Sequence, residues 1–135
     1  MGLANADRTL DYIRILIQFI SQPQYADVIP IFGVVNEALV GDQIPQAAMN
    51  AFYLQVHDMV RSITGTGPGK GPILSLHDGF TGPDNWAGRF PGSDRLAVDT
   101  HPYFAFAEQS VGDLQTQGSL SHRVGWGHEE ANVFQ

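Results

Sequence analysis

The stretch Pro30-Ile31-Phe32-Gly33-Val34-Val35-Asn36-Glu37 joins a nearly continuous apolar run to a polar end. Such a run predicts a strand over 30–36 that is buried on both faces, as in a parallel sheet. Asn36 and Glu37 would then lie at the carboxyl end of the strand, where α/β folds place their chemistry. Glu37 is therefore a candidate general acid/base with Asn36 as its neighbour. Polar residues that only solvate a strand end would produce the same pattern.

Two later apolar runs, 72–76 and 95–100, predict two further strands. Apolar residues at helical spacing predict helices over 7–21 and 45–63, and a short helix is expected at 83–88. Helices that alternate with strands argue for parallel strands joined by right-handed crossovers. The fold class is therefore α/β.

The two long helices carry different signals. Asn5 or Asp7 is expected to cap the first helix by accepting from free backbone N–H groups. The second helix has a stripe of methionine, aromatic and branched side chains, which is expected to face the core. His57 and Asp58 lie off this stripe and are expected to be solvated.

Composition excludes several classes of function. The net charge is −7 and no cluster of Lys or Arg is present, which argues against nucleic acid and anionic membranes as partners. The absence of Cys excludes disulfides, a thiolate nucleophile and Cys-based zinc sites. His122 and His128 stand near two glutamates, but their spacing matches no metal-ligand pattern, so neither a metal nor a cofactor is expected. The loop 64–71 is rich in Gly, yet Lys70 is not followed by Ser or Thr as in a phosphate loop.

All three predicted strands end in polar or titratable residues. They are Asn36 and Glu37 after the first strand, His77 and Asp78 after the second, and His101 and Tyr103 after the third. The carboxyl ends of parallel strands lie on one side of a sheet, so these side chains are expected to converge there. Phe80 and Trp86 follow the second strand and are suited to stacking on sugar rings. Packing within the loops is the alternative reading of these two aromatic residues.

Several segments together resemble the fungal exo-β-1,3-glucanases of glycoside hydrolase family 5, over residues about 7–106. The segments are Asp7–Arg14, Phe32–Glu37, Phe52–Tyr53 with His57–Asp58, His77–Phe80 and Asp99–Phe104. The resemblance implies a secreted or cell-wall hydrolase with a (β/α)8 barrel that cleaves O-glycosidic bonds in β-glucan with retention. Such a mechanism uses two carboxylates about 5 Å apart, one as acid/base and one as nucleophile.

The resemblance also implies roles for single residues. Glu37 would be the acid/base, and Asn36 would hydrogen-bond the 2-hydroxyl of the sugar in the −1 subsite. His101 and Tyr103 would line that subsite, and Phe80 would stack on a sugar near the entrance. His77, Asp78 and Trp86 complete the predicted set of substrate-binding residues.

The chain departs from the family pattern in three ways. Ala38 stands where the family usually has Pro, and none of Glu108, Glu129 and Glu130 ends an apolar run as the nucleophile should. A complete barrel also needs about 250 residues. The sequence therefore predicts a partial barrel of about three strands over 1–106, followed by an irregular tail over 107–135 that does not resemble the family, in a truncated chain without the nucleophile.

Three alternatives to a retaining hydrolase stay open. The first is a non-catalytic carbohydrate-binding or inactive fragment. The second is an α/β domain that closes its own sheet edges or associates with itself through them, because unpaired edges favour association. The third is an inverting enzyme with Asp78 or Asp99 as base, which needs carboxyl groups roughly 6.5–9.5 Å apart. The N-terminus lacks the pattern of a signal peptide, so the sequence leaves the location of this chain open.

Overall fold

The computed structural model describes residues 3–41, 43–101 and 103. The described part falls into two compact units, the first ending at Thr100 and the second beginning at His101. The predicted tail over 107–135, its two histidines and its glutamates lie outside the described residues. The predicted boundary at 106 therefore stays a prediction.

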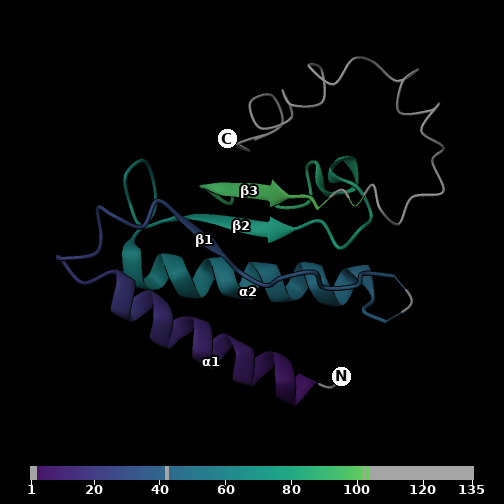
Figure 1. Ribbon diagram of the computed structural model, residues 1–135, viewed down its shortest axis with the longest axis horizontal. Coiled ribbons are helices and arrows are strands. Elements are labelled where there is room, and N and C mark those ends of the chain that lie inside the picture. Colours follow the sequence, from purple (N-terminus) through teal and green to yellow (C-terminus); the bar gives the residue numbers. More distant parts are fainter. Residues whose placement is uncertain (1–2, 42, 102, 104–135) are drawn as a thin grey trace. The chain divides into compact units, whose positions relative to one another are not determined.

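Helices and strands alternate along the first unit in the predicted order (Figure 1). The elements are α1 Leu3–Ile20, β1 Ile31–Gly33, α2 Gln46–Thr64, β2 Ile73–His77, the 3-10 helix η1 Pro83–Trp86 and β3 Leu96–Asp99. The strands form one parallel sheet in the order β1-β2-β3. The α/β class and the parallel pairing are thus confirmed. Three parallel strands in an open sheet are consistent with a part of a barrel.

The strand β1 differs from its prediction. It covers three residues, and the backbone N–H of Val34 adds one more bond to the ladder by donating to the Ser75 carbonyl at 3.0 Å. Ile31 is exposed, so the prediction of a strand buried on both faces is wrong. The reason is position: β1 lies at an edge of the described sheet, and β2 takes the buried central place.

The helix α1 begins at Leu3, earlier than predicted, and ends before Pro23. Asn5 and Asp7 therefore lie inside the helix, and the prediction that one of them caps it is wrong. The helix α2 follows Pro45, and Gly65 ends it with a φ of 80° that a side chain would strain. Of the described helices, none combines the length and apolar character that a membrane crossing requires.

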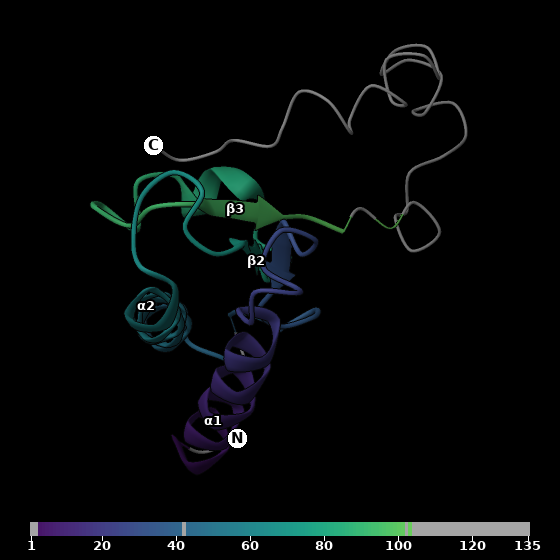
Figure 2. The same ribbon diagram turned by 90° about the vertical axis from the view of Figure 1, so that its left-hand side faces the viewer.

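Both long helices lie on the same side of the sheet (Figures 1 and 2). The predicted apolar stripe of α2 is buried in the core formed by the helices and the sheet, which confirms its expected place. The buried apolar side chains are Ile13, Ile17, Val34, Met49, Tyr53, Val56, Met59, Val60, Leu74, Leu76, Trp86 and Leu96. Their burial holds α2 against the sheet.

His57 is only 7% exposed, so the prediction that it is solvated is wrong, whereas Asp58 is exposed as predicted. His57 lies in a polar cluster around Asp94, whose Oδ1 is 2.8 Å from Arg61 Nε and 3.1 Å from His57 Nε2. The guanidinium of Arg61 also donates to the carbonyls of Pro72, Asp94 and Arg95. Because the cluster joins α2 to the segments that lead into β2 and β3, it fixes the amino ends of these strands.

The cluster stabilises the ionised form of Asp94. Partial burial on its own would raise the pKa of Asp94, but hydrogen bonds from the Gly67 N–H, His57 and Arg61 outweigh it. They hold the pKa at about 2, below the ordinary value of 3.8.

Candidate functional site

The segments that follow β1 and β2 stay side by side beyond the sheet. Gly33 pairs with Ser75, and farther along the Val40 N–H donates to the Gly79 carbonyl at 3.3 Å. A Cβ on Gly79 would lie 2.4 Å from Cγ2 of the Val40 side chain, so Val40 occupies the space that a side chain at position 79 would need. This contact keeps the segment that carries Glu37 next to the carboxyl end of β2.

Asp78 is a buried residue whose hydrogen bonds connect the segments at this edge. It is 3% exposed, and its Oδ1 accepts from the Phe80 N–H at 2.9 Å while Oδ2 accepts from Thr100 Oγ1 at 3.0 Å. Its own N–H donates to the Asp99 carbonyl at 2.8 Å. Both carboxylate oxygens are thus engaged within the protein. This arrangement favours a positioning role for Asp78 over direct contact with a substrate.

His77 is buried beneath the same turn. Its Nδ1 accepts from the Gly79 N–H at 3.0 Å, which places the proton of the neutral imidazole on Nε2. The backbone carbonyl of His77 accepts from the Tyr53 hydroxyl at 2.9 Å. Burial raises the pKa of Tyr53, the nearby carboxylate of Asp78 raises it further, and Tyr53 therefore stays a neutral donor.

The backbone is strained at two predicted site residues. Phe80 has a φ of 63° and Glu37 a φ of 52°, in the left-handed region that bulky side chains avoid. Such conformations cost about 1–3 kcal/mol each and persist where the surrounding structure enforces them, most often at functional sites. At Phe80 the enforcing contacts are the bond to Asp78 and the edge of the His77 ring, whose centroid lies 4.9 Å away.

The two aromatic residues after β2 have opposite environments. Phe80 is 45% exposed and presents its ring at the surface. Trp86 is 1% exposed, its Nε1 donates to the Asp78 carbonyl at 2.7 Å, and its ring stacks on Phe90 with centroids 6.0 Å apart. Trp86 offers no free face to a sugar, so the structure favours its packing alternative.

The other predicted site residues divide between the two units. Asn36 is exposed and Glu37 half-buried in the first unit. His101 and Tyr103 belong to the second unit, where their ring centroids lie 6.4 Å apart at 77°. Their predicted convergence with Glu37 on one subsite stays a prediction.

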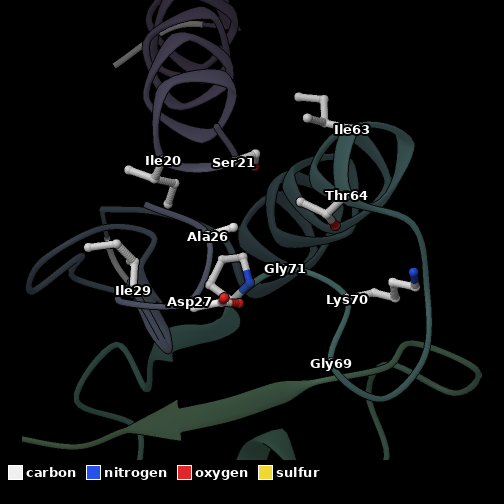
Figure 3. Close-up of a pocket in the computed structure, with 11 residues that line it drawn as sticks. Ile20, Ser21, Ala26, Asp27, Ile29, Ile63, Thr64, Gly69, Lys70 and Gly71 are labelled. Carbon is white, nitrogen blue, oxygen red and sulfur yellow. The ribbon is translucent and has the colours of Figure 1, made fainter. Parts of the chain in front are cut away.

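A pocket of about 240 Å³ lies at the opposite end of the sheet (Figure 3). Ile20 at the end of α1 and Thr64 at the end of α2 line it, together with Lys70 and Pro72 just before β2. It contains none of the predicted site residues. The amino end of a strand is also the end where α/β barrels concentrate stability and not chemistry.

Two residues that support this edge are not among the predicted site residues. The sequence predicts Tyr53 as one member of the apolar stripe of the second helix and Thr100 as the end of a strand. A tyrosine on a buried face needs a partner for its hydroxyl, and this signal points to a polar group under the site. Nothing in the sequence indicates that Thr100 bonds Asp78.

Curated proteins match this chain over most of its length. It is 31% identical over 111 residues to "Probable glucan 1,3-beta-glucosidase D" of Aspergillus flavus, covering 78% of this chain and 12% of that protein. It is 29% identical over 113 residues to "Glucan 1,3-beta-glucosidase 2" of Schizosaccharomyces pombe, covering 82% and 19%. It is 32% identical over 123 residues to "Probable glucan 1,3-beta-glucosidase A" of Aspergillus fumigatus, covering 90% and 27%. The chain is similar to a part of fungal glucan 1,3-beta-glucosidases. This finding confirms the resemblance that the strand-end motifs indicated.

The similarity to glucan 1,3-beta-glucosidases includes the candidate edge. The match to the Aspergillus fumigatus protein covers 90% of this chain. The part left out is too short to reach β1 from the N-terminus or β3 from the C-terminus, so the match contains all three strands. The chain spans 12% to 27% of the length of these relatives. No family model matches the chain.

Proposed function

We propose that this chain forms part of a retaining glycoside hydrolase of family 5 that acts on β-1,3-glucan, with Glu37 as the acid/base carboxylate. Glu37 would protonate the departing glycosidic oxygen and later take a proton from the attacking water. Asn36 would hydrogen-bond the 2-hydroxyl of the sugar. His101 and Tyr103 would complete the −1 subsite. The fold implied by this proposal is a (β/α)8 barrel of a secreted or cell-wall enzyme.

One observation carries the proposal: the segment with Glu37 runs beside the carboxyl end of β2, held there by the contact between Val40 and Gly79. The carboxyl end of a parallel sheet is where barrel enzymes gather their catalytic groups. Strain at Glu37 and Phe80 further supports a site at this edge, because strained backbone clusters at active sites.

The chain would supply one carboxylate of the catalytic pair. The nucleophile of the family follows a later apolar strand, and the later glutamates Glu108, Glu129 and Glu130 do not. Without a nucleophile the covalent glycosyl intermediate cannot form, so we propose that the isolated chain does not hydrolyse β-glucan.

An external nucleophile tests whether the chain supplies the acid Glu37 and lacks only the nucleophile. Azide added to an aryl β-glucoside would attack the anomeric carbon in place of the missing glutamate, while Glu37 protonates the leaving oxygen. We expect no glucose release from laminarin and slow formation of glucosyl azide that is lost in Glu37→Gln and kept in the exposed control Asp84→Asn. Glucose release without azide would contradict the missing nucleophile. Azide transfer that survives Glu37→Gln, or is absent throughout, would contradict the role of Glu37.

A second candidate function is non-catalytic binding of carbohydrate. The observation that favours it is the half-exposed ring of Phe80, which two contacts hold in one orientation. A rigid aromatic surface stacks on sugars without losing side-chain entropy. Retention on insoluble β-glucan that is lost in Phe80→Ala and kept in Glu37→Gln would establish this function. Equal retention of both variants would exclude Phe80 as the binding surface.

A further inference from the structure

The chain turns after β2 through a hydrogen bond that a side chain accepts. Oδ1 of Asp78 accepts from the N–H of Phe80, two residues later, at 2.9 Å. This is the bond of an Asx turn, in which the side chain takes the place of a backbone acceptor. Gly79 and Phe80 both adopt left-handed conformations in this turn, with φ of 65° and 63°. The direction in which the Phe80 ring leaves the surface therefore depends on the Asp78 side chain.

The second carboxylate oxygen of Asp78 connects this turn to the neighbouring strand. The strands β2 and β3 end side by side, with His77 paired to Asp99 (Figure 1). Thr100 follows directly, and its Oγ1 donates to Oδ2 of Asp78 at 3.0 Å. An Asx turn uses only one side-chain oxygen, so the bond from Thr100 is additional to the turn. It holds the carboxylate in the rotation that directs Oδ1 at the Phe80 N–H.

Burial makes this connection rigid. Asp78 is 3% exposed, so solvent does not compete for its oxygens, and a lost donor would leave a buried carboxylate poorly compensated. The backbone carbonyl of Asp78 is also held, because it accepts from Trp86 Nε1 and from Thr81 Oγ1, each at 2.7 Å. Asp78 is therefore fixed at both its backbone and its carboxylate. A change at Thr100 should consequently alter the bond that Asp78 makes with Phe80.

We propose that Thr100 is a positioning residue for sugar binding: through Asp78 it holds the Phe80 ring in the orientation that stacks on β-glucan. This inference rests on the proposed binding of β-glucan at the carboxyl edge of the sheet. Phe80 is the half-exposed aromatic residue there, and a ring that is ordered before binding loses less entropy when a sugar stacks on it. Thr100 acts in this arrangement without touching the sugar.

Amide hydrogen exchange of the full chain tests the connection without any sugar. Thr100→Val removes the hydroxyl and keeps the branched shape, whereas Thr100→Ser keeps the hydroxyl. We expect the Phe80 amide to exchange at least about fivefold faster in Thr100→Val and close to the original rate in Thr100→Ser. Thr66→Val makes the same change at an exposed position in the loop before β2 and should leave the rate unchanged. An unchanged rate in Thr100→Val, or equal acceleration in both valine variants, would overturn the proposal.

A double-mutant cycle tests whether the effect depends on Asp78. Asp78→Ala removes both acceptor oxygens at once. In that background Thr100→Val should therefore cause no further acceleration of exchange at Phe80. Additive effects of the two substitutions would show that Thr100 influences Phe80 by another route, and the proposed role of Asp78 would be wrong.

Depletion binding to insoluble β-1,3-glucan tests the consequence for sugar binding. We expect about threefold to tenfold weaker binding in Thr100→Val, which is the entropic cost of ordering one side chain, and unchanged binding in Thr100→Ser and Thr66→Val. Faster exchange at Phe80 with unchanged affinity would overturn the role of Thr100 in sugar binding. Absence of binding by the unchanged chain would contradict the proposed function itself, and the exchange rates would still show whether Thr100 positions Phe80.

Discussion

Arg61 Nε and Asp94 Oδ1 lie 2.8 Å apart, which joins the last turns of α2 to the residue just before the segment that enters β3. The Arg61 side chain is almost completely buried, and Asp94 is its carboxylate partner in the described part of the chain. A buried guanidinium that loses its counter-ion is costly, so this pair controls much of the stability.

Replacing Asp94 by Asn tests how much the ion pair of Arg61 and Asp94 contributes to the free energy of unfolding. Asp94→Asn removes the charge that compensates Arg61 and should lower the free energy of unfolding by about 2–4 kcal/mol. Asp84→Asn makes the same change on an exposed carboxylate outside the cluster and should cost less than about 0.5 kcal/mol. Urea denaturation of both variants measures the difference, and similar midpoints for the two would contradict a structural role for the cluster.

The lowered pKa of Asp94 gives stability a predictable dependence on pH. Because its pKa is about 2 in the folded chain and 3.8 ordinarily, the unfolded state binds a proton more readily. The stabilisation is therefore complete above about pH 5 and is lost as the pH falls from about 4 to 2. We expect a loss on the order of 1–2 kcal/mol over this window that Asp94→Asn no longer shows. An unchanged acid profile in that variant would refute the assignment.

Gly79 is predicted to be irreplaceable. An alanine here would adopt a φ of 65° and place its Cβ 2.4 Å from Val40, so Gly79→Ala should destabilise the chain by more than about 2 kcal/mol. Gly92 has a similar positive φ of 81° with open space around it. Gly92→Ala should therefore cost only about 1 kcal/mol. Thermal unfolding of the pair separates the steric clash from backbone strain, and equal costs would show that the clash relaxes.

The Tyr53 hydroxyl is expected to support the candidate edge from below. Tyr53→Phe leaves the ring in the core and removes the donor to the His77 carbonyl, at a cost of about 1–2 kcal/mol. Phe52→Leu changes a neighbouring, partly buried aromatic residue without touching the edge. Amide hydrogen exchange should rise at His77 to Phe80 in Tyr53→Phe and stay unchanged there in Phe52→Leu. Exchange that rises equally in both would point to general loosening of the core.

The sequence predicted the helices and strands better than it predicted the burial and the contacts of single side chains. Helical periodicity identified both long helices and continuous apolar runs identified three strands, because these patterns follow from which faces are buried along each element. The burial of β1 could not be predicted, because it depends on which strand takes the central place in the sheet. His57 and Asp78 are further examples. Their burial and partners are set by residues far along the chain, such as Asp94 and Thr100, which no local pattern reveals.

The parallel register has a consequence for how the chain folds. Phe32 pairs with Leu74, 42 positions away, and Leu74 with Leu96, 22 positions away, so no strand pair can form from neighbouring residues. Each pairing must wait for a long loop to close, whereas the backbone hydrogen bonds within α1 and α2 are local. The helices should therefore form before the sheet. The chain should fold slowly, through intermediates whose unpaired strand edges can bind other molecules.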